Sequence, residues 1–196
     1  MKLSEIADIS TGYSFRSKIK DDSEGDTKVI QMSDVDKYRG ILRNQLVSIK
    51  DFDPRSDRYF LRPGDVIMTS KGYNNDAYTI PGSLGKAVTV NSFLVMRLRT
   101  GKIIPEYLEW FLNSKRTQHF FKAVSAGTNI PNLSKRAVEG LDVTFPTLEK
   151  QYDIVELYQL KKQEVYLHQE IASKKETLLD TILQKQADKW KSNNTN

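Results

Sequence analysis

The residue types best suited to reading a nucleic acid lie in one polar segment, residues 70–78 (SKGYNNDAY), after an apolar run that ends at Thr69. Asparagine can pair with an adenine edge, lysine can contact guanine or phosphate, and tyrosine can pack on a sugar or a base. The segment therefore predicts a base-reading loop. A solvated surface loop is the alternative interpretation, because Asn, Asp and Gly also favour turns.

A second polar segment, residues 126–136 (AGTNIPNLSKR), has a similar character. Asn132 or Ser134 can cap a short helix there. Lys135 and Arg136 follow, where a cation can approach a phosphate. This segment is the second candidate for contact with a nucleic acid.

Patterns typical of catalysis are scarce in the chain. His119 and His168 fall in expected helices without a second histidine at metal-ligand spacing, which favours ordinary helix-surface roles. Residues 82–86 (GSLGK) are too short for a Walker loop. Asp65 and Lys71 have a D-x5-K spacing that leaves a small metal-dependent nuclease open, although the usual E-x-K companion is missing.

Short apolar segments separated by turns must position these residues. Strands are expected at residues 28–32, 65–69, 86–90, 93–98 and 141–145. Helices are expected at residues 2–10 and 105–123, the second with Pro105 at its favoured first position. The pattern predicts an α+β fold: a mixed domain of short strands, followed by one long C-terminal helix.

Composition excludes several classes of protein. The chain has 196 residues, of which 38% are hydrophobic, and this suffices for a real core. It has no cysteine, which excludes disulfides, thiolate nucleophiles and cysteine metal sites. The charged N-terminus is unlike a signal peptide, and no run of about 18 apolar residues could span a membrane. A cytoplasmic protein without membrane contact is expected.

The net charge of +5 is concentrated in the first 146 residues. From Thr147 onward eight basic residues balance eight acidic ones, so the whole excess of the 30 basic over the 25 acidic residues precedes that point. A modest basic excess attracts phosphate-rich partners, although many proteins that bind no nucleic acid have as much.

After Pro146 about fifty residues contain neither proline nor glycine, which predicts one long helix. One apolar stripe at helical spacing contains Ile154, Tyr158, Val165, Ala172, Leu179 and Ile182. An adjacent stripe contains Leu157, Leu160, Leu167, Ile171 and Leu178. So wide an apolar surface must be covered. A partner or a second copy is the favoured cover, and packing back onto the chain's own domain is the alternative.

Several segments, taken in their shared order, resemble the specificity (S) subunit of type I restriction-modification systems. The segments are residues 3–12 (LSEIADISTG), 61–69 (LRPGDVIMT), 71–72 (KG), 105–108 (PEYL), 127–134 (GTNIPNLS) and 141–151 (LDVTFPTLEKQ). The resemblance extends over almost the whole chain. It implies a target-recognition domain at residues 1–146, a long coiled-coil helix for dimerisation and subunit docking at 147–190, and a disordered tail at 191–196.

The resemblance implies recognition of double-stranded DNA without catalysis and without a bound cofactor. Methylation with S-adenosylmethionine and ATP-driven cleavage would belong to separate modification (methyltransferase) and restriction subunits. The expected base-proximal residues are Lys71, Tyr73, Asn74, Asn75 and Tyr78, with Thr128, Asn129 and Asn132 shaping the second loop. The expected phosphate contacts are Arg58, Lys86, Lys135 and Arg136.

A full specificity subunit has two recognition domains and two long helices, whereas this chain has one of each. We expect a homodimer that reads a bipartite palindromic site, with the helix as the ruler between half-sites. The expected dimer interface is the first stripe together with His168. Lys161, His168 and Lys175 recur every seven residues, which favours antiparallel over parallel pairing. A protein-interaction adaptor without DNA binding, and the nuclease above, remain alternatives.

Overall fold

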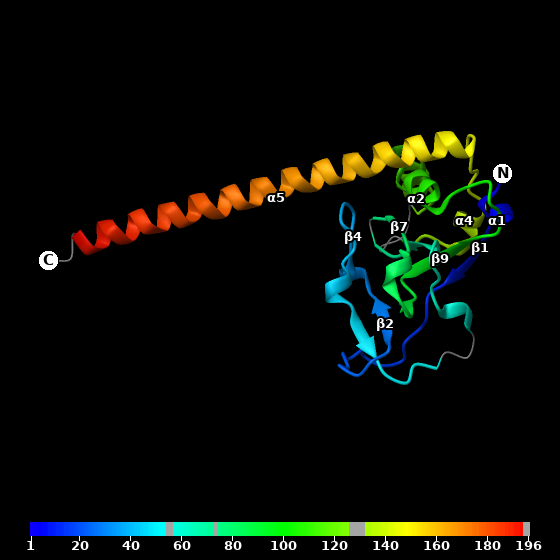
Figure 1. The fold of residues 1–196 in the computed structure, drawn as a ribbon, viewed down its shortest axis with the longest axis horizontal. Helices are drawn as coiled ribbons and strands as arrows, with labels where there is room; N and C mark the ends of the chain where they lie inside the picture. Colours follow the sequence, from blue (N-terminus) through cyan, green and yellow to red (C-terminus); the bar gives the residue numbers. More distant parts are fainter. Residues whose placement is uncertain (54–56, 73, 126–131, 194–196) are drawn as a thin grey trace. The chain divides into compact units, whose positions relative to one another are not determined.

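The structure is a computed structural model that describes residues 1–53, 57–72, 74–125 and 132–193 (Figure 1). The chain divides into two compact units, Met1–Tyr158 and Gln159–Asn196. The helices are α1 (Leu3–Ile6), α2 (Pro105–Asn113), α3 (Lys115–Val124), α4 (Lys135–Glu139) and α5 (Leu148–Asn193). The strands are β1 (Ala7–Thr11), β2 (Thr27–Ile30), β3 (Val35–Asp36), β4 (Gly40–Ile41), β5 (Val47–Ile49), β6 (Val66–Thr69), β7 (Ala77–Thr79), β8 (Ala87–Thr89) and β9 (Phe93–Leu98). Short 3₁₀ helices are η1 (Met32–Asp34), η2 (Arg43–Gln45), η3 (Asp57–Tyr59) and η4 (Gly82–Leu84).

The strands form three sheets in the described part of the first unit. The largest is antiparallel, in the order β1-β9-β6-β7. A second sheet has the order β5-β2-β8, in which β2 pairs with β8 in parallel and with β5 antiparallel. The third is the hairpin of β3 and β4. This arrangement confirms the expected α+β class of short strands followed by a long helix.

Two apolar clusters cover opposite faces of the largest sheet. In β6, Val66 and Met68 belong to the first cluster and Ile67 to the second. In β9, Leu94 and Met96 lie in the first cluster, while Phe93 and Val95 lie in the second. Successive side chains of a strand point to opposite faces. A sheet covered on both sides therefore explains why these strands read as unbroken apolar runs.

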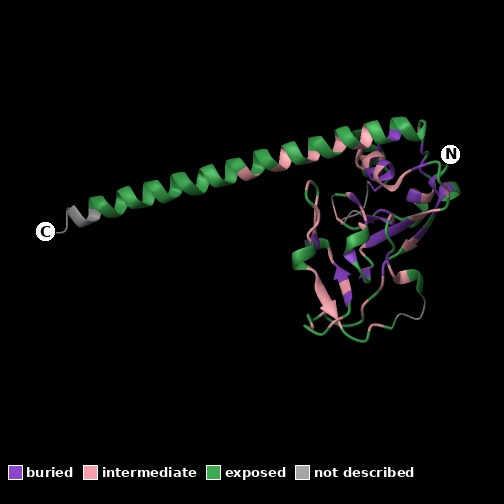
Figure 2. Ribbon diagram, in the orientation of Figure 1, coloured by how far each residue is buried: buried purple, intermediate pink, exposed green. Residues whose placement is uncertain are grey.

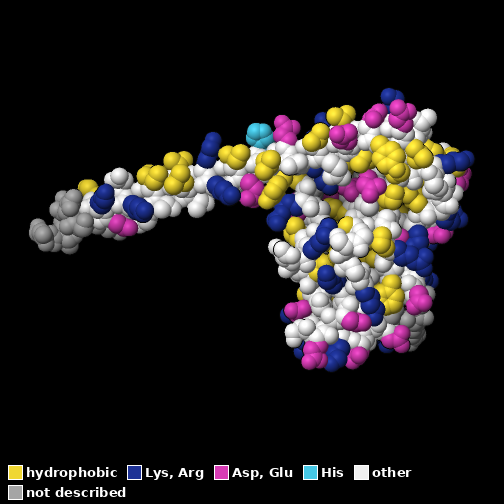
Figure 3. Space-filling model, in the orientation of Figure 1, with side chains coloured by type: hydrophobic (Ala, Val, Ile, Leu, Met, Phe, Trp, Pro, Cys, Tyr) yellow, Lys and Arg dark blue, Asp and Glu magenta, His cyan; other side chains and the backbone are white. Residues whose placement is uncertain are grey.

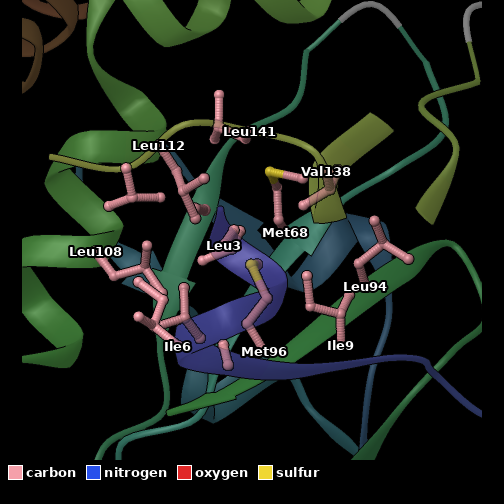
Figure 4. Packing of buried hydrophobic residues seen from close by; sticks show 14 of the residues in the cluster. Leu3, Ile6, Ile9, Met68, Leu94, Met96, Leu108, Leu112, Val138 and Leu141 are labelled. Atoms are coloured by element: carbon pink, nitrogen blue, oxygen red, sulfur yellow. The ribbon is translucent and has the colours of Figure 1, made fainter. Parts of the chain in front are cut away.

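The first cluster joins the sheet to the helices (Figure 4). It brings Leu3 and Ile6 of α1, Leu108 and Leu112 of α2, and Val138 of α4 against β6 and β9. All five of these side chains are buried. In Figure 2 the central strands of the domain are mostly buried, whereas α5 alternates between intermediate and exposed residues from 152 to 170 and is exposed from 171 to 190.

The expected helix at residues 2–10 is wrong beyond Ile6. Helix α1 has a single turn, and the chain then extends into β1, where all five residues pair with β9. Ile9 is buried in the first cluster through this pairing. Tertiary pairing with a complete partner strand has outweighed the helical spacing of Leu3, Ile6 and Ala7.

Two other expected elements differ in detail. The helix expected at residues 105–123 is interrupted at Ser114, whose extended backbone ends α2 and whose hydroxyl accepts from the Thr117 amide to cap α3. The strand expected at 141–145 is an extended segment whose pairing is confined to the N-terminus. Lys2 forms a bridge with Asp142, and the Val143 amide donates to the Met1 carbonyl at 2.8 Å.

Helix α5 begins as part of the domain. The Gln151 side chain is fully buried; its Oε1 accepts from the Ile104 amide at 3.0 Å, and its Nε2 donates to the carbonyls of Lys102 and Pro146. The helix continues to Asn193, three residues into the expected tail at 191–196. Among the described residues, no helix has the length and apolar character needed to cross a membrane.

Candidate nucleic-acid interface

The structure brings the two polar segments singled out in the sequence into one surface. The Leu133 amide donates to the Ser70 carbonyl at 2.8 Å, and Lys71 forms an antiparallel bridge with Asn132. The bridge joins parts of the chain about sixty residues apart. We call this surface, formed by the described residues of 70–76 and 132–136, the joint loop surface.

Strand ends and local hydrogen bonds fix the first of these loops. Ser70 is tied to the carbonyl of Ser92 by both its amide and its hydroxyl. The Thr69 hydroxyl donates to the Asn74 carbonyl at 2.7 Å. Gly72 has a φ of +97°, in the left-handed region that favours glycine. The loop is thus held close to the end of β6.

Asn75 and Tyr78 are buried, so the described structure does not present their side chains for the expected base contacts. Asn75 is 5% exposed, and its Nδ2 donates to the Thr69 carbonyl at 2.9 Å. Tyr78 lies on β7 within the second apolar cluster, and burial raises the pKa of its phenol. Both side chains support the loop from within.

The exposed side chains among the described residues of the joint loop surface are those of Lys71, Asn74, Asn132, Ser134, Lys135 and Arg136. Helix α4 is capped by Ser134, whose hydroxyl accepts from the Ala137 amide, as one of the two expected caps. Lys135 also forms an i,i+4 ion pair with Glu139 at 3.4 Å. The predicted residues Tyr73, Thr128 and Asn129 lie outside the described residues.

Arg58 and Lys86, the other two expected phosphate contacts, are exposed and lie at an aromatic cluster. The Arg58 guanidinium stacks on Tyr59, and the Lys86 ammonium lies over Phe60. Rings in contact with one another build this cluster: Tyr13, Phe15, Phe52, Tyr59 and Phe60. Lys86 also pairs with Asp26 at 2.7 Å, which lowers the pKa of that carboxyl. The structure therefore groups these two cations with each other.

Beside the joint loop surface lies a hairpin that sequence reasoning missed. Strands β3 and β4 are connected by Lys37, Tyr38 and Arg39, and Lys37 Nζ lies 3.7 Å from Asp76 Oδ1. The sequence signal was available, since Asp36 before a three-residue turn and Gly40 after it are typical of a tight hairpin. In Figure 3, Lys and Arg side chains lie over the part of the domain where Figure 1 shows β4 and β7.

Asp65, the acid of the nuclease alternative, has a structural role. It is 2% exposed, and both its oxygens accept from the Arg97 guanidinium, at 2.8 and 2.6 Å. The hydrogen bond with Asp65 is also the main cause of the raised pKa of Arg97. The Oδ2 atom of Asp65 also accepts from the Arg62 amide, and this hydrogen bond closes the turn before β6. A carboxylate so fully engaged is a poor ligand for a catalytic metal.

Helix α2 connects the start of β7, directly after the loop of residues 70–76, to the start of α5. Asn113 exchanges two hydrogen bonds with the backbone of Ala77, each 2.8 Å long, and its Nδ2 also donates to the Tyr158 hydroxyl at 3.0 Å. Burial raises the pKa of Tyr158. Ile154 packs against the first apolar cluster. Ile154 and Tyr158, both partly buried, therefore pack against their own domain, and their expected place in a dimer interface stays a prediction.

The remaining expected interface residues lie further along α5. Val165 is half-buried, whereas His168, Ala172, Leu179 and Ile182 are exposed. The adjacent apolar stripe is exposed over its whole length: Leu157, Leu160, Leu167, Ile171 and Leu178, the first of them 68% exposed. We call these five residues the exposed stripe. Together with other exposed apolar residues of α5, such as Leu179 and Leu183, it is a surface that a partner could cover.

Comparison with solved structures shows the same fold in type I restriction-modification proteins. The HsdS subunit from Thermoanaerobacter tengcongensis matches 84% of this chain with a TM-score of 0.56 and 18% identity, and the S subunit from M. genitalium matches 82% with 0.55 and 14%. A chain from a structure of complex assembly and conformational transition of the type I R-M system matches 92% with 0.64 and 16%. These matches span 37%, 37% and 42% of the respective chains.

A search of curated proteins finds no significant match. The family model of the type I restriction modification DNA specificity domain matches residues 1–174, which include the joint loop surface and much of α5. This match covers well over half of the chain and confirms the resemblance seen in the sequence. The chain belongs to the type I restriction modification DNA specificity domain family.

Proposed function

We propose that this chain reads a sequence of double-stranded DNA through the joint loop surface. The observation that carries the proposal is the junction of the two polar loops by the Leu133–Ser70 hydrogen bond and the Lys71–Asn132 bridge. It places two exposed amide side chains, Asn74 and Asn132, on loops that also carry cations. Amides can discriminate base edges, and cations can hold the phosphates on either side.

We assign different tasks to the exposed side chains of this surface. Asn74 reads a base edge, because an exposed amide offers a donor and an acceptor together. Lys135 and Arg136 contact phosphates and fix the register on the duplex without reading sequence. The basic excess of the first 146 residues favours the same partner.

The second part of the proposal is a homodimer in which two α5 helices cover each other's exposed stripe. Together with positions 164 and 174, the five residues form a series with alternating spacings of three and four, as in a coiled-coil seam. Glu164 and Lys174 occupy the two seam positions at which the apolar pattern is broken. A parallel pair in register would place each of these charges against its own copy, so antiparallel pairing is favoured.

One antiparallel register places Glu164 and Lys174 against each other and also matches most other seam positions in polarity or charge. If Glu164 faces Lys174 of the second copy, Leu160 faces Leu178 and Leu167 faces Ile171. The same register sets Lys150 against Asp188, Asp153 against Lys185 and Leu157 against Thr181. A shift of one heptad in either direction places Lys174 against Leu157 or Ile171 instead. The overlap from residue 150 to residue 188 is about 58 Å of helix, which would set the spacing between two half-sites.

The dimer would present two copies of the joint loop surface, related by a twofold axis, to a palindromic bipartite site. In this role the chain is a non-catalytic subunit of a cytoplasmic complex. The methyltransferase and restriction subunits would carry out the chemistry, and this chain would recognise the DNA sequence at which they act. The family match and the fold shared with HsdS subunits support this assignment.

The reading surface is tested by comparing Asn74→Ala with Lys135→Ala. Asn74→Ala should reduce the preference for the target over random duplex by about 1–3 kcal/mol, because a bidentate base contact is lost. Lys135→Ala should weaken binding to both DNAs alike and flatten the plot of log K against log salt concentration by about one unit. Binding titrations at several salt concentrations measure both effects.

The target for these titrations is found by sequencing methylated sites in cells that carry the chain with its methyltransferase subunit. An equal loss on target and random duplex for Asn74→Ala would contradict the reading role. If the wild-type chain binds no duplex even with the methyltransferase subunit present, the adaptor interpretation is favoured.

A further inference from the structure

We propose that the tip of the β3–β4 hairpin, Lys37 to Arg39, is a further DNA-binding element that grips the phosphate backbone beside the joint loop surface. This inference rests on the proposed function. It adds a third segment, remote in sequence from both polar loops, to the same binding face. Its ligand is the phosphate backbone of duplex DNA, so it contributes affinity and placement, not base reading.

The hairpin tip has a fixed shape. Val35 pairs with Ile41 and Asp36 with Gly40, which leaves three residues in the turn. Asp36 Oδ1 accepts from the amides of Tyr38 and Arg39 at 2.9 and 2.8 Å. Gly40 closes the turn with a φ of +76°. A turn held by its own side chain loses little conformational entropy on binding, which favours affinity.

The base of the hairpin is fixed as well. Asp34, which is buried, accepts from the Gln31 amide through its carboxylate at 2.8 Å. Its carbonyl accepts from the Leu42 amide, also at 2.8 Å, across the two ends of the hairpin. The tip is therefore presented from an anchored support.

An ion pair and a close approach of the backbone place the hairpin next to the loop of residues 70–76. The Lys37–Asp76 pair joins the tip to the residue that precedes β7. At the base, a Cβ added to Gly72 would lie 3.9 Å from Met32 Cε. Met32 is itself exposed and belongs to η1, just before the hairpin. A duplex that contacts Lys71 and Asn74 would pass within reach of the tip.

Charge gives the two cations of the tip different tasks. The Lys37 and Arg39 side chains are exposed, 55% for Lys37, whereas that of Asp76 is 14% exposed. The Asp76 carboxylate would repel a phosphate, and Lys37 offsets its charge. Lys37 thus attracts the backbone and also masks an acid beneath it. Arg39 presents a planar guanidinium, whose fork suits a phosphate.

The experiment measures binding of the full chain to target and random duplex with Lys37→Gln, Arg39→Gln and Lys37→Gln/Asp76→Asn. Arg39→Gln should weaken binding about three- to tenfold on both DNAs and lower the salt slope by about 0.9. Lys37→Gln should weaken it further, because Asp76 is unmasked. The double variant should recover that additional loss.

The matched control is Lys50→Gln, which removes an exposed lysine paired with Glu24 at 2.6 Å and should leave binding unchanged. Circular dichroism melting shows whether each variant keeps the fold. Hairpin variants that bind like the Lys50 variant, while Asn74→Ala still relaxes sequence preference, would overturn this inference alone. A wild-type chain that binds no duplex would overturn the proposed function, and this inference with it.

Discussion

Two adjacent asparagines have opposite environments in the reading loop. The Asn74 side chain is exposed, while its carbonyl accepts from the Thr69 hydroxyl. The Asn75 side chain is buried and donates to the Thr69 carbonyl, and the Asn75 carbonyl accepts from Gln118 Nε2 at 2.9 Å. The same residue type is thus available for recognition at one position and committed to the fold at the next.

Asn75→Ala should lower the free energy of unfolding by about 1–3 kcal/mol, because a buried hydrogen bond to the Thr69 carbonyl is lost. Chemical denaturation measures the change. Asn74→Ala is the control and should stay within about 0.5 kcal/mol of the wild type, because its side chain is exposed. Equal stability of the two variants would show that the Asn75 hydrogen bond contributes little.

At the scale of elements, Asn113 couples the reading loop to the beginning of α5. Its side chain holds both backbone groups of Ala77 and the hydroxyl of Tyr158. Gln118 of α3 donates to the carbonyl of Asn75, two residues before Ala77. Strand β7 and the first turns of α5 therefore share one polar contact on α2.

Asn113→Ala should expose the Ala77 amide to exchange and destabilise the domain by about 1–3 kcal/mol, since a backbone donor loses its acceptor. Hydrogen exchange of residues 75–79 together with chemical denaturation measures both effects. Tyr158→Phe is the matched variant, because it removes only the hydroxyl and leaves Asn113 on Ala77. Protection of Ala77 that survives Asn113→Ala would contradict the proposed coupling.

Elements with strong local patterns could be predicted from the sequence. The strand at 93–98 and the helix start at Pro105 agree with the structure, because an apolar run and a favoured first helical residue act locally. The strand β1 could not be distinguished from a continued helix, because its conformation depends on β9, ninety residues away. The same limit applies to the two asparagines, since the partner of Asn75 is set by tertiary structure.

At the scale of the whole molecule, the antiparallel register proposed for α5 predicts how changes of charge at Glu164 and Lys174 affect dimerisation. Glu164→Lys or Lys174→Glu alone should weaken the dimer about tenfold or more, because each creates a repulsive pair twice by symmetry. The double variant should restore association, and so should mixing the two single variants. Sedimentation over a range of concentrations measures the dimer constant.

The single variants also separate the two orientations. In a parallel dimer the wild type already sets Glu164 against Glu164 and Lys174 against Lys174. Either single change would then leave the number of repulsive pairs the same, and association would not fall. Unchanged association of both single variants would therefore reject the antiparallel register. A wild type that stays monomeric at micromolar concentration would reject the dimer itself.

The charges of this seam also bear on which chains combine when a cell holds several specificity proteins of this kind. In the proposed antiparallel dimer, a second copy of the same sequence would satisfy the pairs Glu164–Lys174 and Asp153–Lys185. A different chain lacking this order of charges would meet like charges or bury an unpaired one. A few substitutions along α5 could then allow or prevent dimers of two different chains. The set of DNA targets recognised by such dimers would change, although the loops that contact DNA would stay the same.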